Sequence, residues 1–134
     1  MENLNPLDSN SLNHISHIIL DSAIAVHRAM GPGLLEAVYQ HCMVRELRSR
    51  QLDVKITVPV SLHYKGECVN KDYIIDMLVE NEIIVELKAI EIVLKVHEAQ
   101  IISYLKLANK RLGFLINFNV PLLKLGFKRF VNKF

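Results

Sequence analysis

The sequence predicts an α/β fold in which helices pack on a mixed β-sheet, with the elements in the order α-α-β-β-β-α-β-β. Three observations predict this class. Apolar residues recur at helical spacing up to residue 50 and then alternate with polar residues at the two-residue period of a strand. A meander of three strands is followed by a crossover helix and a short apolar strand. We expect one domain over residues 11–134, since this length suffices for a single core.

The composition excludes several classes of protein. The chain is 51% hydrophobic and 22% charged, so it is not disordered throughout. Its longest apolar runs are far shorter than the ~20 residues of a membrane helix, and residues 1–10 form a polar lead-in without a signal-peptide pattern. Cys42 and Cys68 are too few for a disulfide framework or a four-cysteine zinc site. We therefore expect a cytoplasmic protein with reduced cysteines.

Two helices are predicted in the first part of the chain. Asn10 or Ser11 is expected to cap the first helix, and Gly31-Pro32-Gly33 ends it, because proline cannot continue a helix. The apolar stripe of this helix consists of Leu12, Ile15, Ile19, Ala23 and Val26. The second helix is predicted over residues 34–50. The residues that we expect it to bury are Leu35, Val38, Cys42 and Leu47.

Five strands and one further helix are predicted in the rest of the chain. In order, they are the strands 54–62, 68–79 and 83–89, the helix 93–108, and the strands 112–118 and 124–131. Pro59 cannot donate to a ladder, so its strand is expected at an edge or to contain a bulge. The strand 112–118 is almost wholly apolar and is expected to be buried on both faces.

Charge is distributed unevenly along the chain. Residues 1–98 contain all 14 acids and nine Lys or Arg, whereas residues 99–134 contain seven bases and no acid. This basic region could contact phosphates, or it could be an ordinary solvated face. The candidates for a nucleic-acid contact are Lys106, Lys110, Arg111, Lys124, Lys128 and Arg129.

The strongest local signal for chemistry is Asp76 together with Glu86-Leu87-Lys88. If residues 80–82 form the turn, Asp76 lies directly opposite Glu86, and Lys88 projects from the same face. Two carboxylates this close repel each other unless a cation lies between them, and Mg²⁺ or Mn²⁺ would suit. Lys88 could orient or deprotonate a water molecule, or hold a phosphate oxygen. A solvated ladder of ion pairs is the alternative interpretation.

Two helices carry further polar groups. Glu36 and Tyr39 are three residues apart and share a side of the second helix, where an acid in the first turn is also favourable with the helix dipole. His97, Gln100 and Tyr104 form a polar stripe on the third helix. This stripe could line a site or could be the solvated side of an amphipathic helix.

Gly33-x-x-Glu36-x-x-Tyr39 resembles the signature for which the bacterial GxxExxY protein family is named. The later segments that resemble this family are Tyr64-Lys65-Gly66, Asp76, Glu86-Leu87-Lys88, His97-Glu98-Ala99-Gln100, Ser103-Tyr104-Leu105 and Asn117-Phe118. Together they span the chain from about His14 to Val131. That family is placed in the PD-(D/E)XK nuclease superfamily, whose α-β-β-β-α-β core is similar to the predicted order. The resemblance thus implies a restriction-endonuclease-like fold.

The resemblance also implies an activity, which is metal-dependent hydrolysis of phosphodiester bonds, and we expect DNA in preference to RNA as the substrate. It implies that Asp76 and Glu86 bind Mg²⁺ or Mn²⁺ and that Lys88 is the catalytic lysine. The carbonyl of Leu87 and the carboxylate of Glu36 would complete the metal site. Gln100 and Tyr104 would line it from the following helix.

One position departs from the family pattern. Relatives commonly have an arginine two residues before the first acid, where this chain has Ile74, so Lys71 or the basic C-terminal region would have to take over its task. A binding or assembly module that does not cleave, and an enzyme acting on small nucleotides, are therefore the alternatives. A homodimer formed through the strand 54–62 or the last strand is a further expectation.

Overall fold

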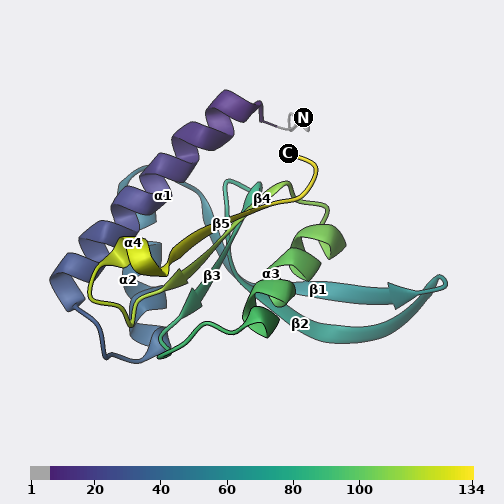
Figure 1. The fold of residues 1–134 in the computed structure, drawn as a ribbon. Helices are drawn as coiled ribbons and strands as arrows, with labels where there is room; N and C mark the ends of the chain where they lie inside the picture. The colour runs from purple at the N-terminus through teal and green to yellow at the C-terminus, as the bar shows by residue number, and fades with distance from the viewer. Residues whose placement is uncertain (1–6) are drawn as a thin grey trace.

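The computed structural model describes residues 7–134, apart from the side chains of residues 70–72. The helices are α1 (Ser9–Met30), α2 (Glu36–Ser49), α3 (Lys95–Leu107) and the short α4 (Leu123–Gly126). The strands are β1 (Val54–Tyr64), β2 (Glu67–Val79), β3 (Ile83–Lys88), β4 (Leu112–Asn117) and β5 (Phe127–Val131). They form one sheet in the order β1-β2-β3-β4-β5, with α1 and α2 on one face and α3 on the other (Figure 1).

The pairing of the strands confirms the predicted mixed sheet. β3 and β4 are parallel and joined through α3, whereas all other neighbours are antiparallel. β2 pairs with β3 through Met77↔Val85, Leu78↔Ile84 and Val79↔Ile83, which is the predicted register. Residues 80–82 form the turn, and Glu80 and Asn81 adopt left-handed backbone angles there. Pro59 lies on the edge strand β1, as expected.

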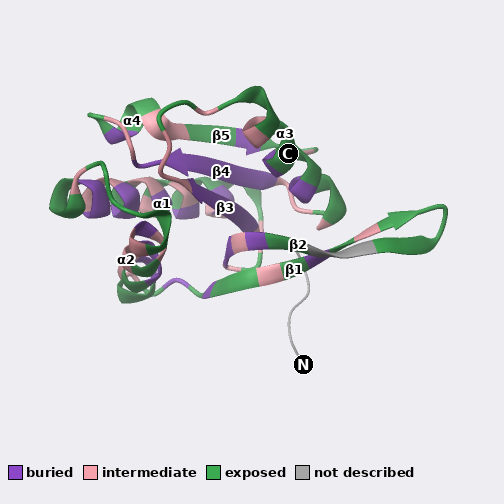
Figure 2. Cartoon of the chain, turned by 90° about the horizontal axis from the view of Figure 1, so that it is seen from below, coloured by how far each residue is buried: buried purple, intermediate pink, exposed green. Residues whose placement is uncertain are grey.

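Two apolar clusters form the core, one on each face of the sheet. The first lies between the sheet and α1 with α2, and it contains the whole predicted stripe of α1. The second lies under α3. β4 is buried along its entire length, which confirms the prediction for that strand, whereas the far end of the β1–β2 hairpin is exposed (Figure 2). Within the described part of the chain, no helix is long and apolar enough to cross a membrane.

Helix α1 begins earlier than predicted. Its N-cap is Asp8, whose carboxylate accepts a hydrogen bond from the Ser11 N–H at 2.7 Å, so the prediction of Asn10 or Ser11 as the cap is wrong. Asn10 and Ser11 instead lie inside the first turn of the helix. Of the polar lead-in expected over residues 1–10, residues 1–6 lie outside the described residues.

The buried face of α2 differs from the prediction. Leu47 is buried as expected, but Leu35 is 77% exposed, and Val38 and Cys42 are only partly buried. Leu35 is the N-cap, with an extended backbone, so its side chain does not share a helical face with the residues that follow. The buried residues of this helix are Tyr39, Met43, Val44 and Leu47.

Tyr39 attaches α2 to the loop that precedes it. Its hydroxyl donates a hydrogen bond to the Gly31 carbonyl at 2.5 Å and accepts one from the Leu34 N–H at 3.1 Å. Its ring stacks on Phe118, with the centroids 4.5 Å apart. Tyr39 is therefore a core residue that sets where α2 begins.

The C-terminal part differs from the prediction of one strand over residues 124–131. The structure has the short helix α4 there, and β5 starts only at Phe127. Leu123 enters the core, and the chain passes so close to β4 that a Cβ at Gly126 would lie 2.0 Å from the Asn117 carbonyl oxygen. The close approach therefore requires glycine where α4 ends. The remaining strand boundaries, and those of α2 and α3, lie within two residues of their predicted positions.

Tyr39→Phe should reduce the free energy of unfolding by about 1–3 kcal/mol, because it leaves two backbone groups without their partner while keeping the ring. Tyr64→Phe, at an exposed tyrosine, is the matched control and should change this free energy by no more than about 0.5 kcal/mol. Urea unfolding followed by circular dichroism measures both. Equal effects of the two substitutions would contradict the role given to the Tyr39 hydroxyl.

Candidate active site

Strands β2 and β3 separate at Asp76 and Glu86. The ladder ends at Met77↔Val85, and beyond it the two carboxylates take the place of ladder hydrogen bonds. The Asp76 N–H donates to Glu86 Oε1 at 3.1 Å, and the Leu87 N–H donates to Asp76 Oδ2 at 2.9 Å. The predicted meeting of these two acids is thereby present in the structure.

The other side of Asp76 is also irregular. The register of β1 with β2 passes from Ile56↔Met77 to Val58↔Ile75 and omits Thr57, which has a φ of 50°. The Asp76 carbonyl accepts a hydrogen bond at 3.4 Å from Nε2 of Gln40, a residue of α2. Side chains thus hold both backbone groups of Asp76. Sequence reasoning missed Gln40, although it lies one helical turn after Glu36 and shares its face.

Glu86 is the most strongly perturbed acid of the site. Glu86 is buried, with only 5% of its surface exposed to solvent. Burial raises the pKa of Glu86 to about 9, and the charge of Asp76 and a hydrogen bond with its side chain contribute to the rise. The hydrogen bond from the Asp76 N–H and the charge of Lys88 act in the opposite direction without cancelling it. Glu86 therefore holds a proton at neutral pH when no cation is bound.

Glu36 lies close enough to the pair to be influenced by it. Partial burial raises the pKa of Glu36, the charge of Asp76 raises it further, and Lys88 lowers it. Glu36 is the first residue of α2, and Lys88 is the last residue of β3, so two elements meet here. Among the described residues, however, no three or more His, Cys, Asp or Glu gather as a ready-made metal cluster.

Helix α3 carries Tyr104 and Gln100, the two residues predicted to line the site. Tyr104 is buried, and its hydroxyl accepts a hydrogen bond from Gln100 Nε2 at 3.1 Å. Burial raises the pKa of Tyr104, and the charges of Glu86 and Asp76 raise it further. The phenol therefore keeps its proton, and the charges of both acids act on it.

His97, the third member of the predicted polar stripe, has a different role. Its Nδ1 accepts a hydrogen bond from the Leu94 N–H at 2.9 Å, which satisfies a backbone group at the start of α3.

A buried asparagine fixes the segment that follows Lys88. Asn117 accepts a hydrogen bond from the Ile90 N–H at 3.1 Å and donates one to the Ile90 carbonyl at 2.8 Å. In addition, the Phe118 N–H donates to the Lys88 carbonyl at 2.9 Å. Sequence reasoning assigned Asn117 no role, because a lone polar residue at the end of an apolar strand does not reveal its partner.

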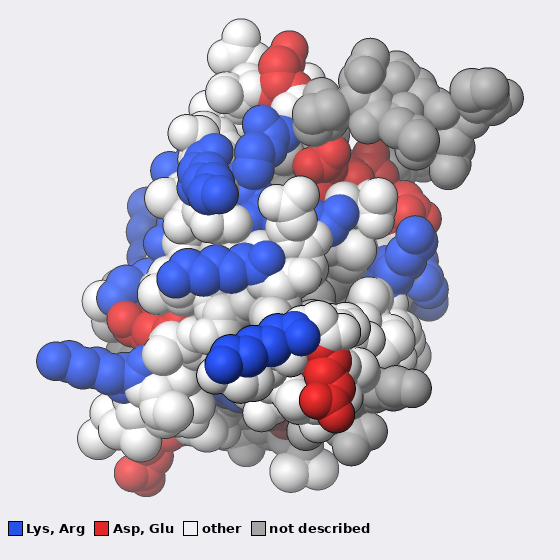
Figure 3. Space-filling view, turned by 90° about the vertical axis from the view of Figure 1, so that its right-hand side faces the viewer, with Lys and Arg blue, Asp and Glu red and all other residues white. Residues whose placement is uncertain are grey.

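Three of the six predicted phosphate-binding bases have partners within the chain. Lys110 donates to the Asn81 carbonyl, Arg111 contacts the Leu7 carbonyl and Glu82, and Lys128 pairs with Glu98. Lys106 and Lys124 are exposed, and Arg129 lies over the ring of Phe134. Figure 3 shows basic side chains spread over one side of the molecule with acidic ones among them. The side chain of Lys71 lies outside the described residues.

Glu86→Gln should make the stability of the metal-free chain less dependent on pH. Below the ordinary pKa of 4.5, Glu86 is protonated in both the folded and the unfolded chain. As the pH rises from there through the folded pKa of about 9, the unfolded chain gives up this proton more readily than the folded chain, so the free energy of unfolding falls. The melting temperature of the wild-type chain should therefore fall relative to that of Glu86→Gln between about pH 5 and pH 9. Thermal unfolding in EDTA measures this, with Glu91→Gln, an exposed acid, as control. A constant difference across this range would contradict the burial argument.

Comparison with known proteins agrees with this geometry. A family model described as the PD-(D/E)XK nuclease superfamily matches residues 13–130, which is nearly the whole chain and includes every site residue discussed above. Searches of curated proteins and of solved structures each found no match. The match confirms the predicted restriction-endonuclease-like α/β fold, whereas the finer resemblance to GxxExxY proteins stays a prediction. The chain belongs to the PD-(D/E)XK nuclease superfamily.

Proposed function

We propose that this chain is a metal-dependent nuclease that hydrolyses phosphodiester bonds beside Asp76, Glu86 and Lys88. The observation that carries the proposal is the carboxylate pair at the point where β2 and β3 separate. The superfamily match supports a nuclease-like activity. The substrate class and the metal dependence belong to the proposal.

The chemistry of the donor atoms fits a divalent cation such as Mg²⁺ or Mn²⁺. Asp76 and Glu86 supply hard carboxylate oxygens, and each uses only one oxygen for the backbone N–H that it accepts. Burial and the charge of Asp76 both raise the pKa of Glu86, and a cation beside the two carboxylates would offset both effects. The Leu87 carbonyl and Glu36 are the further proposed ligands. When bound, the cation would polarise the scissile phosphate and stabilise charge on the leaving oxygen.

Lys88 is the proposed catalytic lysine. Its half-buried side chain follows Glu86 on the same strand, and its charge acts on both Glu86 and Glu36. An ammonium group there can orient the attacking water or hold a phosphate oxygen. The rigid attachment of the next segment through Asn117 limits the movement of its backbone.

Tyr104 and Gln100 are proposed to contact the substrate from α3. Because the pKa of Tyr104 is raised, first by burial, its hydroxyl remains a hydrogen-bond donor at neutral pH. The Gln100 amide orients this hydroxyl. The two residues could thus contact a phosphate oxygen on the side of the site opposite α2.

The proposed partner is nucleic acid, with DNA favoured over RNA as the substrate. The exposed bases of the C-terminal region, Lys106, Lys124 and Arg129, are candidates to hold its phosphates without reading bases. Ile74 is 47% exposed, so its position presents an apolar surface where relatives commonly place an arginine. We also propose a single domain over residues 11–134, a cytoplasmic location, and a homodimer formed through one of the edge strands, β1 or β5.

The second candidate function is a nucleic-acid-binding or assembly module without cleavage. Ile74 favours it, because an exposed apolar side chain stands where relatives commonly have an arginine. This candidate predicts salt-sensitive binding that survives Lys88→Ala and Glu86→Ala, with no turnover.

The deciding experiment is a cleavage assay with Mg²⁺ or Mn²⁺ on linear, circular, single-stranded and branched DNA and on RNA. We expect metal-dependent cleavage that EDTA abolishes and that Lys88→Ala lowers by at least about 10²-fold in kcat, the size of a lost proton-transfer or orienting group. Lys133→Ala, at an exposed lysine near the C-terminus, is the matched control and should leave kcat unchanged.

Two outcomes would contradict the nuclease proposal. Cleavage that persists in Lys88→Ala would show that the assigned lysine is wrong. An absence of cleavage, together with a metal-induced rise in melting temperature that Asp76→Ala abolishes, would favour the binding module.

A further inference from the structure

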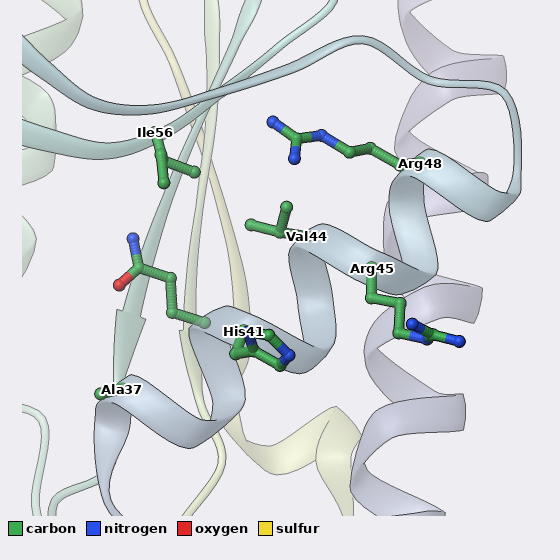
Figure 4. Close-up of a pocket in the computed structure, with 7 residues that line it drawn as sticks. Ala37, His41, Val44, Arg45, Arg48 and Ile56 are labelled. Carbon is green, nitrogen blue, oxygen red and sulfur yellow. The ribbon is translucent and has the colours of Figure 1, made fainter.

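A groove with a volume of about 540 Å³ opens between α2 and β1. Figure 4 shows Arg48 reaching from α2 towards β1, with Val44 and His41 on the same helix and Ile56 opposite them. Arg45 also lines the groove, and its side chain is directed away from Arg48 and Ile56 (Figure 4). The groove differs from the basic C-terminal region, which contributes none of its lining residues.

The lining of the groove is basic and apolar. Arg45 and Arg48 line it, and no acid does. Among the described residues, Arg45 forms no hydrogen bond or ion pair, and Arg48 donates only to the Val54 carbonyl at 2.8 Å, so no carboxylate neutralises either guanidinium. Val44 and Ile56, which is 45% exposed, add apolar surface between these charges. Such a surface suits a polyanionic ligand that also has apolar groups to place against Val44 and Ile56.

One residue, Gln40, connects the groove with the candidate active site. It lines the groove and donates to the Asp76 carbonyl, and α2 itself begins at Glu36. At about 1.5 Å per residue, Arg48 lies roughly 12 Å along the helix from Gln40, on the side of α2 that lines the groove. This distance corresponds to about three to four nucleotide steps of a strand that rises ~3.4 Å per step.

We propose that this groove binds the nucleic-acid strand on one side of the cleaved bond, with Arg45 and Arg48 contacting its phosphates and Val44 and Ile56 contacting its sugars. The proposal rests on the proposed function, because it extends the substrate of that site along α2. It also places phosphate contacts outside the basic region of residues 99–134.

The test is the salt dependence of binding to a fluorescent single-stranded DNA oligonucleotide in EDTA, followed by fluorescence anisotropy. Arg45→Gln should lower the affinity severalfold and should reduce the slope of log K against log salt concentration by about 0.7, the value for one lost phosphate contact. Arg50→Gln removes a charge from the same end of the helix and is the control, because Arg50 is paired with Glu46. It should leave the slope unchanged.

The outcomes separate this proposal from the nuclease proposal. An Arg45→Gln slope equal to that of the wild type, or a wild-type chain that does not bind, overturns the groove assignment even if cleavage is observed. A reduced slope without any cleavage supports the groove and contradicts the nuclease. A change in oligomeric state by Arg45→Gln in sedimentation, with unchanged DNA binding, assigns the groove to a second copy of the chain and overturns the proposal.

Discussion

The fold and the candidate site both depend on two acidic side chains that replace the hydrogen bonds of a β-ladder. Asp76 and Glu86 lie where β2 and β3 separate, and each accepts a backbone N–H that the ladder no longer pairs. A buried N–H without a partner would cost free energy, so the separation of the strands requires such acceptors. The opening in the sheet and the charge beside it therefore have the same origin.

The groups around this opening are held by residues that do not themselves face it. Tyr39 ties the loop before Glu36 to the core, and Asn117 fixes the segment after Lys88. Both lie in the interior, Tyr39 in the first turn of α2, which carries Glu36, and Asn117 at the end of β4, beside the strand β3 that carries Lys88. This arrangement places the charged side chains on backbone positions that are held from the interior, which is a general requirement of sites that must hold a precise geometry.

The mixed sheet, the register of β2 with β3 and the meeting of Asp76 with Glu86 could be predicted from the sequence, because alternation and a short turn determine which side chains meet. Helical spacing marked the polar residues of α2 and α3, and the family resemblance supplied the roles predicted for Glu36, Gln100 and Tyr104. Features that depend on distant contacts were not predictable. The exposure of Leu35 follows from its position as a cap, and α4 accommodates the close approach of Gly126 to Asn117. Gln40 acts through a backbone carbonyl of another element, and no local pattern reports such a contact.

The left-handed turn at residues 80–82 has a consequence for how relatives of this chain can be found. Nine residues separate Asp76 from Glu86, and six of them are paired strand residues while three form the turn. The spacing of the two acids along the chain is thus partly a property of the turn. A longer turn would widen this spacing and leave the six paired residues, and the contact of the carboxylates, unchanged. A search for acids at one fixed spacing would pass over such chains, whereas a search for the two paired strands with their terminal acids would detect them.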